Sequence, residues 1–332
     1  MTSAYLKAIF VMGVAFATTA AFADSALDVL GKDYTFPNQI KGLPGRLSDF
    51  KGLQINSFTT NDGVTLRYWE AGQGQPIIFV PGWSANGAEY INVMYLLSRH
   101  YRVIVLDQRN QGLSPNVAYG NRIARFSMDL KELTEHLHIE SADYCGWSMG
   151  ASVLWSYIDL FGSKGIRKAV FVDEPISIVS HADWTARQKT EEGAAFSSPD
   201  QLMTALSQPV PEHPDPSDLS LMARFKMRDS PYFANSEGFA EAVVHSDPAS
   251  MMQVMYNHAS SDWRDVLQYK VNVPVAIFTG EYSPNATAQK TVHALVPGSE
   301  LHVYSKTEQG DHFLMFKNPV KFTQDLSAFL AK

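Results

Sequence analysis

Short, continuous apolar runs recur along this chain and restrict its fold more than any other sequence feature. They lie at residues 77–80, 103–106, 142–145 (which includes Asp143), 169–172 and 275–278. Runs of this length suit strands that are buried on both faces, as the strands of a parallel sheet are. Stretches with helical periodicity separate them, at residues 89–98, 125–137, 151–161 and 288–295. This alternation predicts an α/β fold whose parallel strands are joined by right-handed crossovers.

Three further segments extend the predicted sheet to eight strands. Residues 55–59 and 64–70 alternate between apolar and polar side chains, with Asn61-Asp62-Gly63 between them. An Asp-Gly pair between alternating runs is a strong signal for an antiparallel hairpin. A last strand at residues 301–304 and a last helix at 320–330 close the chain. We therefore expect a mostly parallel, eight-stranded sheet flanked by helices.

A long interval after the run at residues 169–172 breaks this rhythm. Four prolines crowd residues 209–216, and helical pieces rich in methionine follow. Because no strand-like run interrupts this interval, we predict a mainly helical cap at residues 175–267. The α/β core is then expected to be discontinuous, with one part at residues 24–174 and the other at 268–332.

Residues 1–23 are typical of a cleavable signal peptide. One charge, Lys7, precedes an apolar run at residues 8–17, and the segment ends Ala21-Phe22-Ala23, a small-x-small cleavage pattern. A membrane anchor is the alternative, but the run is shorter than the ~20 apolar residues that span a bilayer. We predict cleavage after Ala23, a periplasmic or secreted protein, and no stable membrane span.

Composition narrows the classes of partner and site. The single cysteine, Cys145, excludes an internal disulfide and any site built from several cysteines, and its apolar surroundings predict a buried, inert thiol. A net charge of −7 argues against a nucleic-acid partner. A hydrophobic content of 45% excludes a mainly disordered chain. None of these numbers indicates the oligomeric state.

The strongest chemical signal is the segment Gly146 to Gly150, which reads Gly-Trp-Ser-Met-Gly. It follows a strand-like run and opens a helix, which is the setting of a sharp turn that exposes a nucleophilic serine. We predict that Ser148 is this nucleophile. The amide of Met149, at the start of the helix, is then placed to donate to a developing oxyanion.

A serine hydroxyl is a weak nucleophile and needs a base. His312 lies in Gly310-Asp311-His312-Phe313, after the last predicted strand and before the last helix. A loop there lies at the edge of the sheet where parallel strands end, so it can reach Ser148. The other histidines flank strands, end a helix or lie in the predicted cap. We therefore predict His312 as the base.

The acid that would orient the imidazole is less narrowly defined. Asp173 directly follows the run at residues 169–172, with Glu174 next to it, and Glu281 follows the run at 275–278. Each stands near a strand end on the rim that carries the nucleophile. We favour Asp173, with Glu281 second and Glu174 third; helix capping or loop bracing is the alternative role for Asp173.

Two loops are expected to support this site. Pro81-Gly82-Trp83 follows the run at residues 77–80, and the Trp83 amide is the natural second oxyanion donor. The loop at residues 107–114, Asp-Gln-Arg-Asn-Gln-Gly-Leu-Ser, follows the next run. We expect it to brace the oxyanion loop, with contact to a polar substrate as the alternative.

These motifs resemble the α/β-hydrolase fold, and in particular its cap-bearing esterases, lactonases and non-haem haloperoxidase-like members. The resemblance covers residues 57–330 and follows the family's order of serine, acid and histidine. Three departures stand out. Pro81 stands where a His-Gly pair is common, which leaves the backbone donor intact. Asn110-Gln111 replaces a usual Gly-His pair, and Ser283 occupies the usual place of the acid. In some relatives the acid moves to the end of the preceding strand, which matches Asp173.

The resemblance implies a serine hydrolase that cleaves an ester, lactone or related carbonyl compound of small size through an acyl-enzyme. Neither a metal nor an organic cofactor is expected. A serine at position 148 disfavours the dehalogenases and epoxide hydrolases of this fold, which use an aspartate there. Perhydrolysis with haloperoxidase activity, cofactor-free dioxygenation and non-catalytic ligand binding stay open as alternatives. The methionine- and aromatic-rich cap suggests an apolar acyl or aryl pocket, although methionines at helical spacing usually pack as core.

Overall fold

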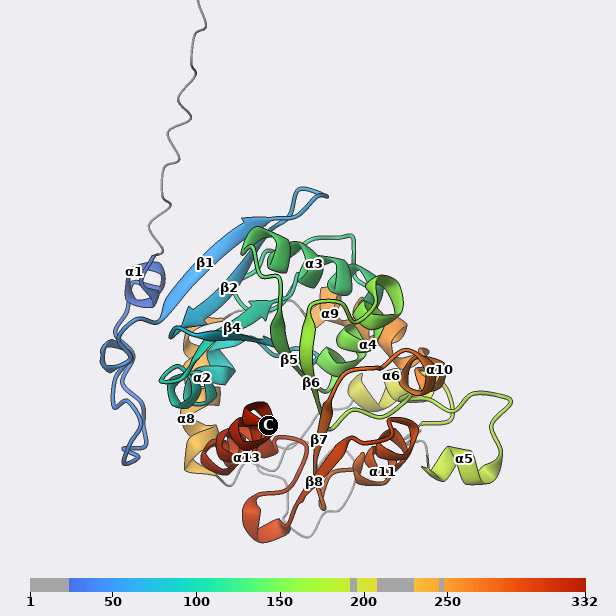
Figure 1. The fold of residues 1–332 in the computed structure, drawn as a ribbon. Helices are drawn as coiled ribbons and strands as arrows, with labels where there is room; N and C mark the ends of the chain where they lie inside the picture. The colour runs from blue at the N-terminus through green and yellow to red at the C-terminus, as the bar shows by residue number, and fades with distance from the viewer. Residues whose placement is uncertain (1–23, 192–195, 208–229, 245–247) are drawn as a thin grey trace, which may run out of the picture.

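The computed structural model describes residues 24–191, 196–207, 230–244 and 248–332 (Figure 1). The predicted signal peptide, residues 1–23, lies outside the described residues. Among the helices that are described, none combines the length and the apolar character that a bilayer crossing requires.

The predicted eight-stranded sheet is confirmed, and each strand contains or closely overlaps the run that predicted it. The strands are β1 (Gln54–Thr59), β2 (Thr65–Ala71), β3 (Gln75–Val80), β4 (Tyr101–Asp107), β5 (Ala142–Trp147), β6 (Ile166–Val172), β7 (Val275–Gly280) and β8 (Glu300–Tyr304). Their order in the sheet is β1-β2-β4-β3-β5-β6-β7-β8. The β1–β2 and β2–β4 pairs are antiparallel and the others are parallel.

Helices cover both faces of the sheet, as the apolar runs require (Figure 1). One face packs against α2 (Ile91–Leu97), α12 (Leu314–Lys317) and α13 (Pro319–Ala331). The other packs against α3 (Ile123–His136), α4 (Met149–Phe161), α10 (Arg264–Tyr269) and α11 (Ala286–Leu295). The N-terminal segment with α1 (Ala26–Leu30) adds Phe36, Leu47 and Phe50 to the first of these layers.

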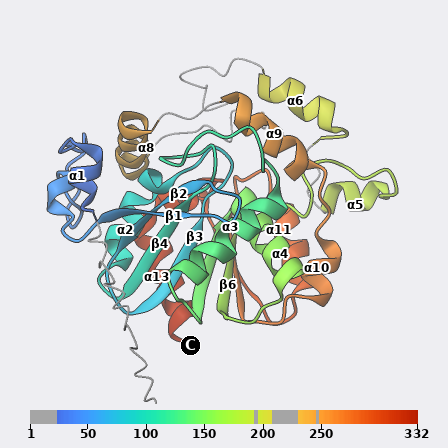
Figure 2. The ribbon, with the colours of Figure 1, turned by 90° about the horizontal axis from the view of Figure 1, so that it is seen from above.

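Additional helices lie between β6 and β7, within the interval predicted as a cap. They are α5 (Ala186–Glu191), α6 (Pro199–Ser207), α8 (Pro231–Val243) and α9 (Pro248–Ala259). Figure 2 shows α6, α8 and α9 along one edge of the molecule, outside the two layers that flank the sheet. The prolines at residues 209–216 lie outside the described residues. The boundaries of the cap, 175–267, stay a prediction.

Strand β5 lies in the interior of the sheet and leads directly into the turn that carries Ser148. All of its residues are buried, and it pairs in parallel with β3 on one side and β6 on the other. Cys145 lies in this strand with no exposed surface, and burial raises the pKa of its thiol well above the usual range. The prediction of a buried thiol is confirmed.

Candidate active site

Ser148 occupies a strained turn between β5 and α4. Its backbone has φ 53° and ψ −134°, a conformation that costs of the order of 1–3 kcal/mol. Its amide donates to Val172 O at 2.8 Å, which ties the turn to the end of β6. A Cβ on Gly146 would lie 2.5 Å from Gly150 O, and one on Gly150 would lie 1.9 Å from Val80 O. The glycines are therefore required for the close packing that supports the turn.

His312 comes from the loop between β8 and α12. Its carbonyl accepts from Trp147 Nε1 at 2.8 Å, and the adjoining Gly310 O accepts from Tyr282 N at 2.9 Å. These bonds hold the loop against the end of β5 and the start of the loop after β7. In this position His312 Nε2 lies 3.1 Å from Ser148 Oγ. The base and nucleophile predicted from sequence are thus brought within hydrogen-bond distance.

Asp173 lies directly after β6, fully buried, and faces the other nitrogen of His312. Its Oδ2 atom lies 2.6 Å from His312 Nδ1. Because an ionised carboxylate only accepts hydrogen bonds, this contact favours the tautomer that carries a proton on Nδ1. Nε2 is then free of a proton and directed at the serine hydroxyl. Asp173 itself has φ 55°, and its amide donates to Phe278 O at 2.9 Å.

The other two acid candidates are placed elsewhere. Glu281 is an exposed residue beyond the end of β7. Glu174 is buried, but its carboxylate contacts Ser152 and His258. Of the three carboxylates considered, the structure places that of Asp173 against His312.

Three polar side chains from β7 and the turn after it surround Asp173, and their role was not predicted from the sequence. Thr279 Oγ1 donates to Asp173 Oδ1, and Ser283 Oγ donates to Oδ2. Asn285 Nδ2 donates to the backbone carbonyl of Asp173 at 2.9 Å. The signal that could have found them is Ser283 itself, which stands where the family places its acid. Here it donates to a carboxylate that comes from the neighbouring strand.

The predicted oxyanion donors border Ser148 from two sides. Met149 is the first residue of α4, and the first amides of a helix have no partner within it. On the other side, a Cβ on Gly82 would lie 3.0 Å from Ser148 Cβ, so the loop after β3 passes close to the serine. Trp83 follows in this loop, and its indole Nε1 donates to Met251 O of α9 at 2.8 Å.

The loop at residues 107–114 braces its surroundings, as expected. Asp107 accepts from Gly87 N at 2.6 Å, from Leu113 N at 2.9 Å and from Trp69 Nε1 at 2.9 Å. Burial raises the pKa of Asp107 to about 6, although these three donors act to lower it. Gln108 Nε2 donates to Pro81 O at 3.3 Å and so supports the oxyanion loop directly.

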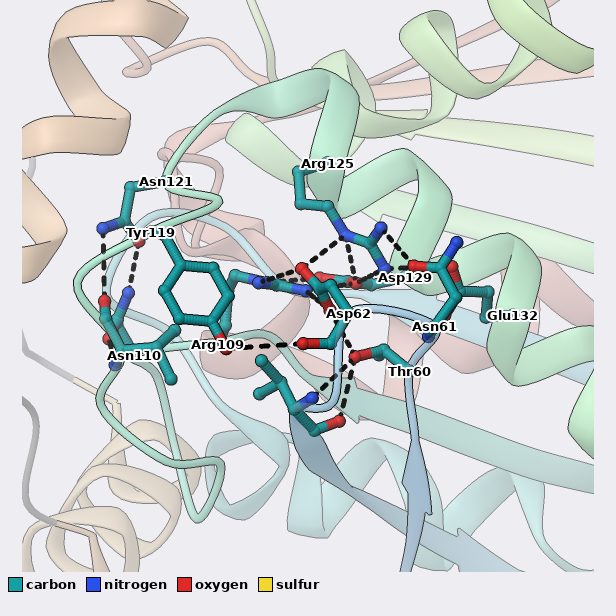
Figure 3. Close-up of polar contacts among 12 residues, drawn as sticks. Thr60, Asn61, Asp62, Arg109, Asn110, Tyr119, Asn121, Arg125, Asp129 and Glu132 are labelled. Atoms are coloured by element: carbon teal, nitrogen blue, oxygen red, sulfur yellow. Dashed lines mark hydrogen bonds and ion pairs between the residues drawn. The ribbon is translucent and has the colours of Figure 1, made fainter.

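Figure 3 shows the ion-pair network that anchors the same loop. The buried guanidinium of Arg109 donates to both carboxylate oxygens of Asp129, each at 2.7 Å, and reaches Asp62 of the hairpin turn at 3.1 Å. Arg125 pairs with Asp129 and with Glu132. The shared carboxylates balance the buried positive charge of Arg109. The network joins the β1–β2 hairpin, the loop and α3.

The arrangement has the parts needed for acyl transfer. A hydroxyl faces a histidine nitrogen, a carboxylate faces the other nitrogen, and a helix N-terminus adjoins the hydroxyl. Across the described residues, no group of three or more histidine, cysteine, aspartate or glutamate side chains is arranged to hold a metal ion.

A family model described as the alpha/beta hydrolase fold matches residues 75–314, a stretch that runs from β3 past His312. The chain belongs to the α/β-hydrolase fold family. The resemblance inferred from the motifs is thereby confirmed, and the protein is a hydrolase of this family.

Relatives named as a chloroperoxidase and as an esterase each align with most of this chain. Over 283 residues it is 25% identical to non-heme chloroperoxidase CPO-A1 of Kitasatospora aureofaciens, covering 82% of this chain and 98% of the relative. It is 26% identical to a pimeloyl-[acyl-carrier protein] methyl ester esterase of Vibrio cholerae, covering 80% and 98%. A bromoperoxidase structure from Bacillus anthracis aligns with a TM-score of 0.64 at 21% identity, covering 84% and 100%. This last likeness supports the fold alone.

Proposed function

We propose that this α/β hydrolase is a serine hydrolase that cleaves small ester, lactone or related carbonyl substrates. The observation that carries the proposal is the chain of contacts from Ser148 Oγ to His312 Nε2 at 3.1 Å and from His312 Nδ1 to Asp173 Oδ2 at 2.6 Å. Ser148 acts as nucleophile, His312 as general base and acid, and Asp173 as the group that orients the imidazole.

In the first half of the reaction, Ser148 Oγ attacks the substrate carbonyl carbon while its proton passes to His312 Nε2. The Asp173 carboxylate stabilises the resulting imidazolium through the Nδ1–H bond. The carbonyl oxygen becomes an oxyanion, which accepts hydrogen bonds from the amides of Met149 and Trp83. His312 then gives its proton to the leaving alkoxide, and the acyl group stays on Ser148 as an ester.

The second half of the reaction repeats these steps with water. His312 Nε2 takes a proton from a water molecule, whose oxygen attacks the acyl-enzyme carbonyl. The same two amides hold the second oxyanion. Its collapse returns the proton to Ser148 Oγ and releases the carboxylic acid. Every group that takes part in these two half-reactions belongs to the protein, the substrate or water, so the proposed reaction uses no cofactor.

Perhydrolysis is the second candidate activity, because the chain is similar to a protein named as a non-heme chloroperoxidase. Hydrogen peroxide would replace water as the attacker of the acyl-enzyme and would release a peracid. The peracid would then oxidise a halide ion in solution. We rank perhydrolysis second. It uses the same residues as hydrolysis, but it also requires hydrogen peroxide to compete with water for the acyl-enzyme.

A substrate panel tests both candidates. We expect an active-site fluorophosphonate probe to label the protein, and p-nitrophenyl esters or lactones to be hydrolysed without added cofactor. With acetate and peroxide present, peroxide-dependent halogenation is expected to be slower than ester hydrolysis. Absence of both labelling and hydrolysis would contradict the proposal. Halogenation faster than hydrolysis of every ester and lactone would favour the second candidate.

We also propose that the protein is exported and that residues 1–23 are removed. The support is the order of charge, apolar run and small-x-small pattern before Asp24. N-terminal sequencing of the protein from its native cells is expected to begin at Asp24. A mature protein that begins at Met1 would contradict export by a cleaved signal peptide.

A further inference from the structure

A buried ion pair lies next to His312, in the loop that carries it and in the helix that follows. Lys317 Nζ lies 2.6 Å from Asp311 Oδ2, and the side chains of Lys317 and Asp311 are 2% and 6% exposed. The other carboxylate oxygen, Oδ1, accepts from Phe313 N at 2.8 Å. The carboxylate of Asp311 is thus bound to the backbone directly after His312, and it holds the short turn that presents the imidazole.

The lysine is fixed from the opposite side. It is the last residue of α12, and its backbone carbonyl accepts from Ser230 Oγ at 2.6 Å, just before α8 begins. Phe233 of α8 packs on Phe313, with the ring centroids 5.1 Å apart. The ion pair therefore joins the histidine loop to a helix that α8 holds in place.

Stability alone does not account for an ion pair at this depth. The loss of hydration of two buried charges offsets most of their attraction, and apolar side chains of similar volume often serve as well. Burial raises the pKa of Asp311, whereas Lys317, the Phe313 amide and the charge of a protonated His312 act to lower it. The interaction between Asp311 and His312 is mutual, so the carboxylate also favours the protonated imidazole.

The surroundings of His312 strengthen such an interaction. The side chain is nearly buried, and the rings of Trp147 and Phe313 lie 5.1 and 5.4 Å from its ring. In apolar surroundings a charge acts more strongly than in water. The elements packed around this loop carry the described titratable groups Asp173 after β6, Tyr232 and Glu237 of α8, Glu281 and Tyr282 after β7, and Lys317 of α12. Asp173 contacts the imidazole directly, whereas Glu281 is exposed and its charge is screened.

We propose that Asp311 and Lys317 are positioning residues for His312. Their ion pair fixes the loop that carries the imidazole, and the Asp311 carboxylate favours the imidazolium that forms when Ser148 attacks the substrate. The inference rests on the proposed function, because it concerns the charge that His312 acquires in that reaction. Asp173 acts on this charge by direct contact and Asp311 acts without contact, while Lys317 limits the effect of Asp311.

Asp311→Asn is the informative variant, because the amide oxygen can still accept from Phe313 N while the negative charge is lost. With Lys317 still positive, protonation of His312 becomes less favourable. The acid-side midpoint of the pH profile of kcat/KM for p-nitrophenyl acetate is therefore expected to move to lower pH, by about 0.5–1 unit. A weaker base takes the Ser148 proton less readily, so kcat on the alkaline plateau is expected to fall about two- to fivefold.

A purely structural role would give a different result. Looser packing of the loop would lower kcat at every pH and leave the midpoint where it is in the wild type. A midpoint in Asp311→Asn that does not move, or that moves to higher pH, would overturn the inference.

The double variant Asp311→Asn/Lys317→Gln keeps the test independent of how well the single variant folds. It does not leave the buried ammonium without the Asp311 carboxylate, which is the costly outcome of breaking a buried pair. Because the positive charge is removed as well, its midpoint is expected to lie between those of Asp311→Asn and the wild type. A midpoint no closer to the wild type than that of Asp311→Asn would contradict the role of Lys317.

Asp325→Asn is the matched control. Asp325 also pairs with a lysine, Lys321, at 3.1 Å, and it accepts from the hydroxyl of Tyr304 at 2.7 Å. This pair lies within α13, beyond the loop that carries His312. Its acid-side midpoint is expected to equal that of the wild type. A shift equal to that of Asp311→Asn would reflect the loss of any acidic charge and would overturn the inference.

Failure of the inference is distinguishable from failure of the proposed function. If the wild type reacts with a fluorophosphonate probe and hydrolyses the ester, but Asp311→Asn keeps the wild-type midpoint, the inference is wrong and the serine hydrolase proposal stands. If the wild type neither reacts with the probe nor hydrolyses any ester or lactone, the proposed function is wrong and the inference is wrong with it.

Discussion

Replacing Ser148 by alanine is expected to abolish ester turnover and leave the fold intact. Loss of the hydroxyl removes the atom that would form the acyl-enzyme, and comparable changes in serine hydrolases lower kcat by about 10⁴–10⁶-fold. Alanine keeps the Cβ, so the strained backbone at φ 53° is no more costly than before. We expect the free energy of unfolding to change by less than about 0.5 kcal/mol. Steady-state hydrolysis of p-nitrophenyl acetate and denaturant unfolding measure the two quantities.

Ser156→Ala is the matched control for this experiment. Ser156 is another buried serine of α4, further along the helix from the site. Its substitution is expected to leave kcat and probe labelling unchanged. If Ser148→Ala kept wild-type turnover, or if the two variants lost activity equally, Ser148 would not be the nucleophile.

Replacing Asp173 by asparagine is expected to lower kcat by about 10³–10⁴-fold, as loss of the orienting carboxylate does in other serine hydrolases. The carboxylate oxygens accept from Thr279, Ser283 and His312. An amide can offer an oxygen to only some of these donors and turns its own N–H groups toward the rest. The imidazole then loses the tautomer that keeps Nε2 free of a proton. The kcat for p-nitrophenyl acetate measures the effect.

Two further substitutions distinguish the role of the Asp173 carboxylate from the roles of residues near it. Glu281→Gln changes an exposed side chain and is expected to keep kcat within about twofold of the wild-type value. Ser283→Ala removes one donor to Asp173 but keeps the carboxylate, so we expect a loss of at most about tenfold. A severe loss in Glu281→Gln with none in Asp173→Asn would reverse the assignment.

Most of the fold was predictable because its signals are local. A strand buried on both faces is mostly apolar along its length, which marks β3 to β7 in the sequence without reference to their neighbours, although β5 includes the charged Asp143. The turn at Ser148 was predictable for a related reason. Its glycines are required by close backbone contacts within the turn and with β3. The same contacts occur in any strand–turn–helix of this kind, so the sequence motif alone predicts them.

The surroundings of the site were less predictable, because they depend on contacts between segments far apart in the chain. No local pattern relates Ser283 to a carboxylate on the preceding strand, and none relates His258 of α9 to Glu174. Both contacts arise only after β6 and β7 pair and the inserted helices pack over their ends.

By itself, the sequence determined the α/β architecture, the nucleophile turn and the loop that carries the histidine, since periodicity and turn chemistry act between near neighbours. Only the tertiary structure decided which carboxylate faces His312. That histidine lies 139 residues from Asp173, and Asp173, Glu174 and Glu281 all stand near the same rim. The pairing of β6 with β7 and the left-handed backbone at Asp173 direct one of them at the imidazole and the others away.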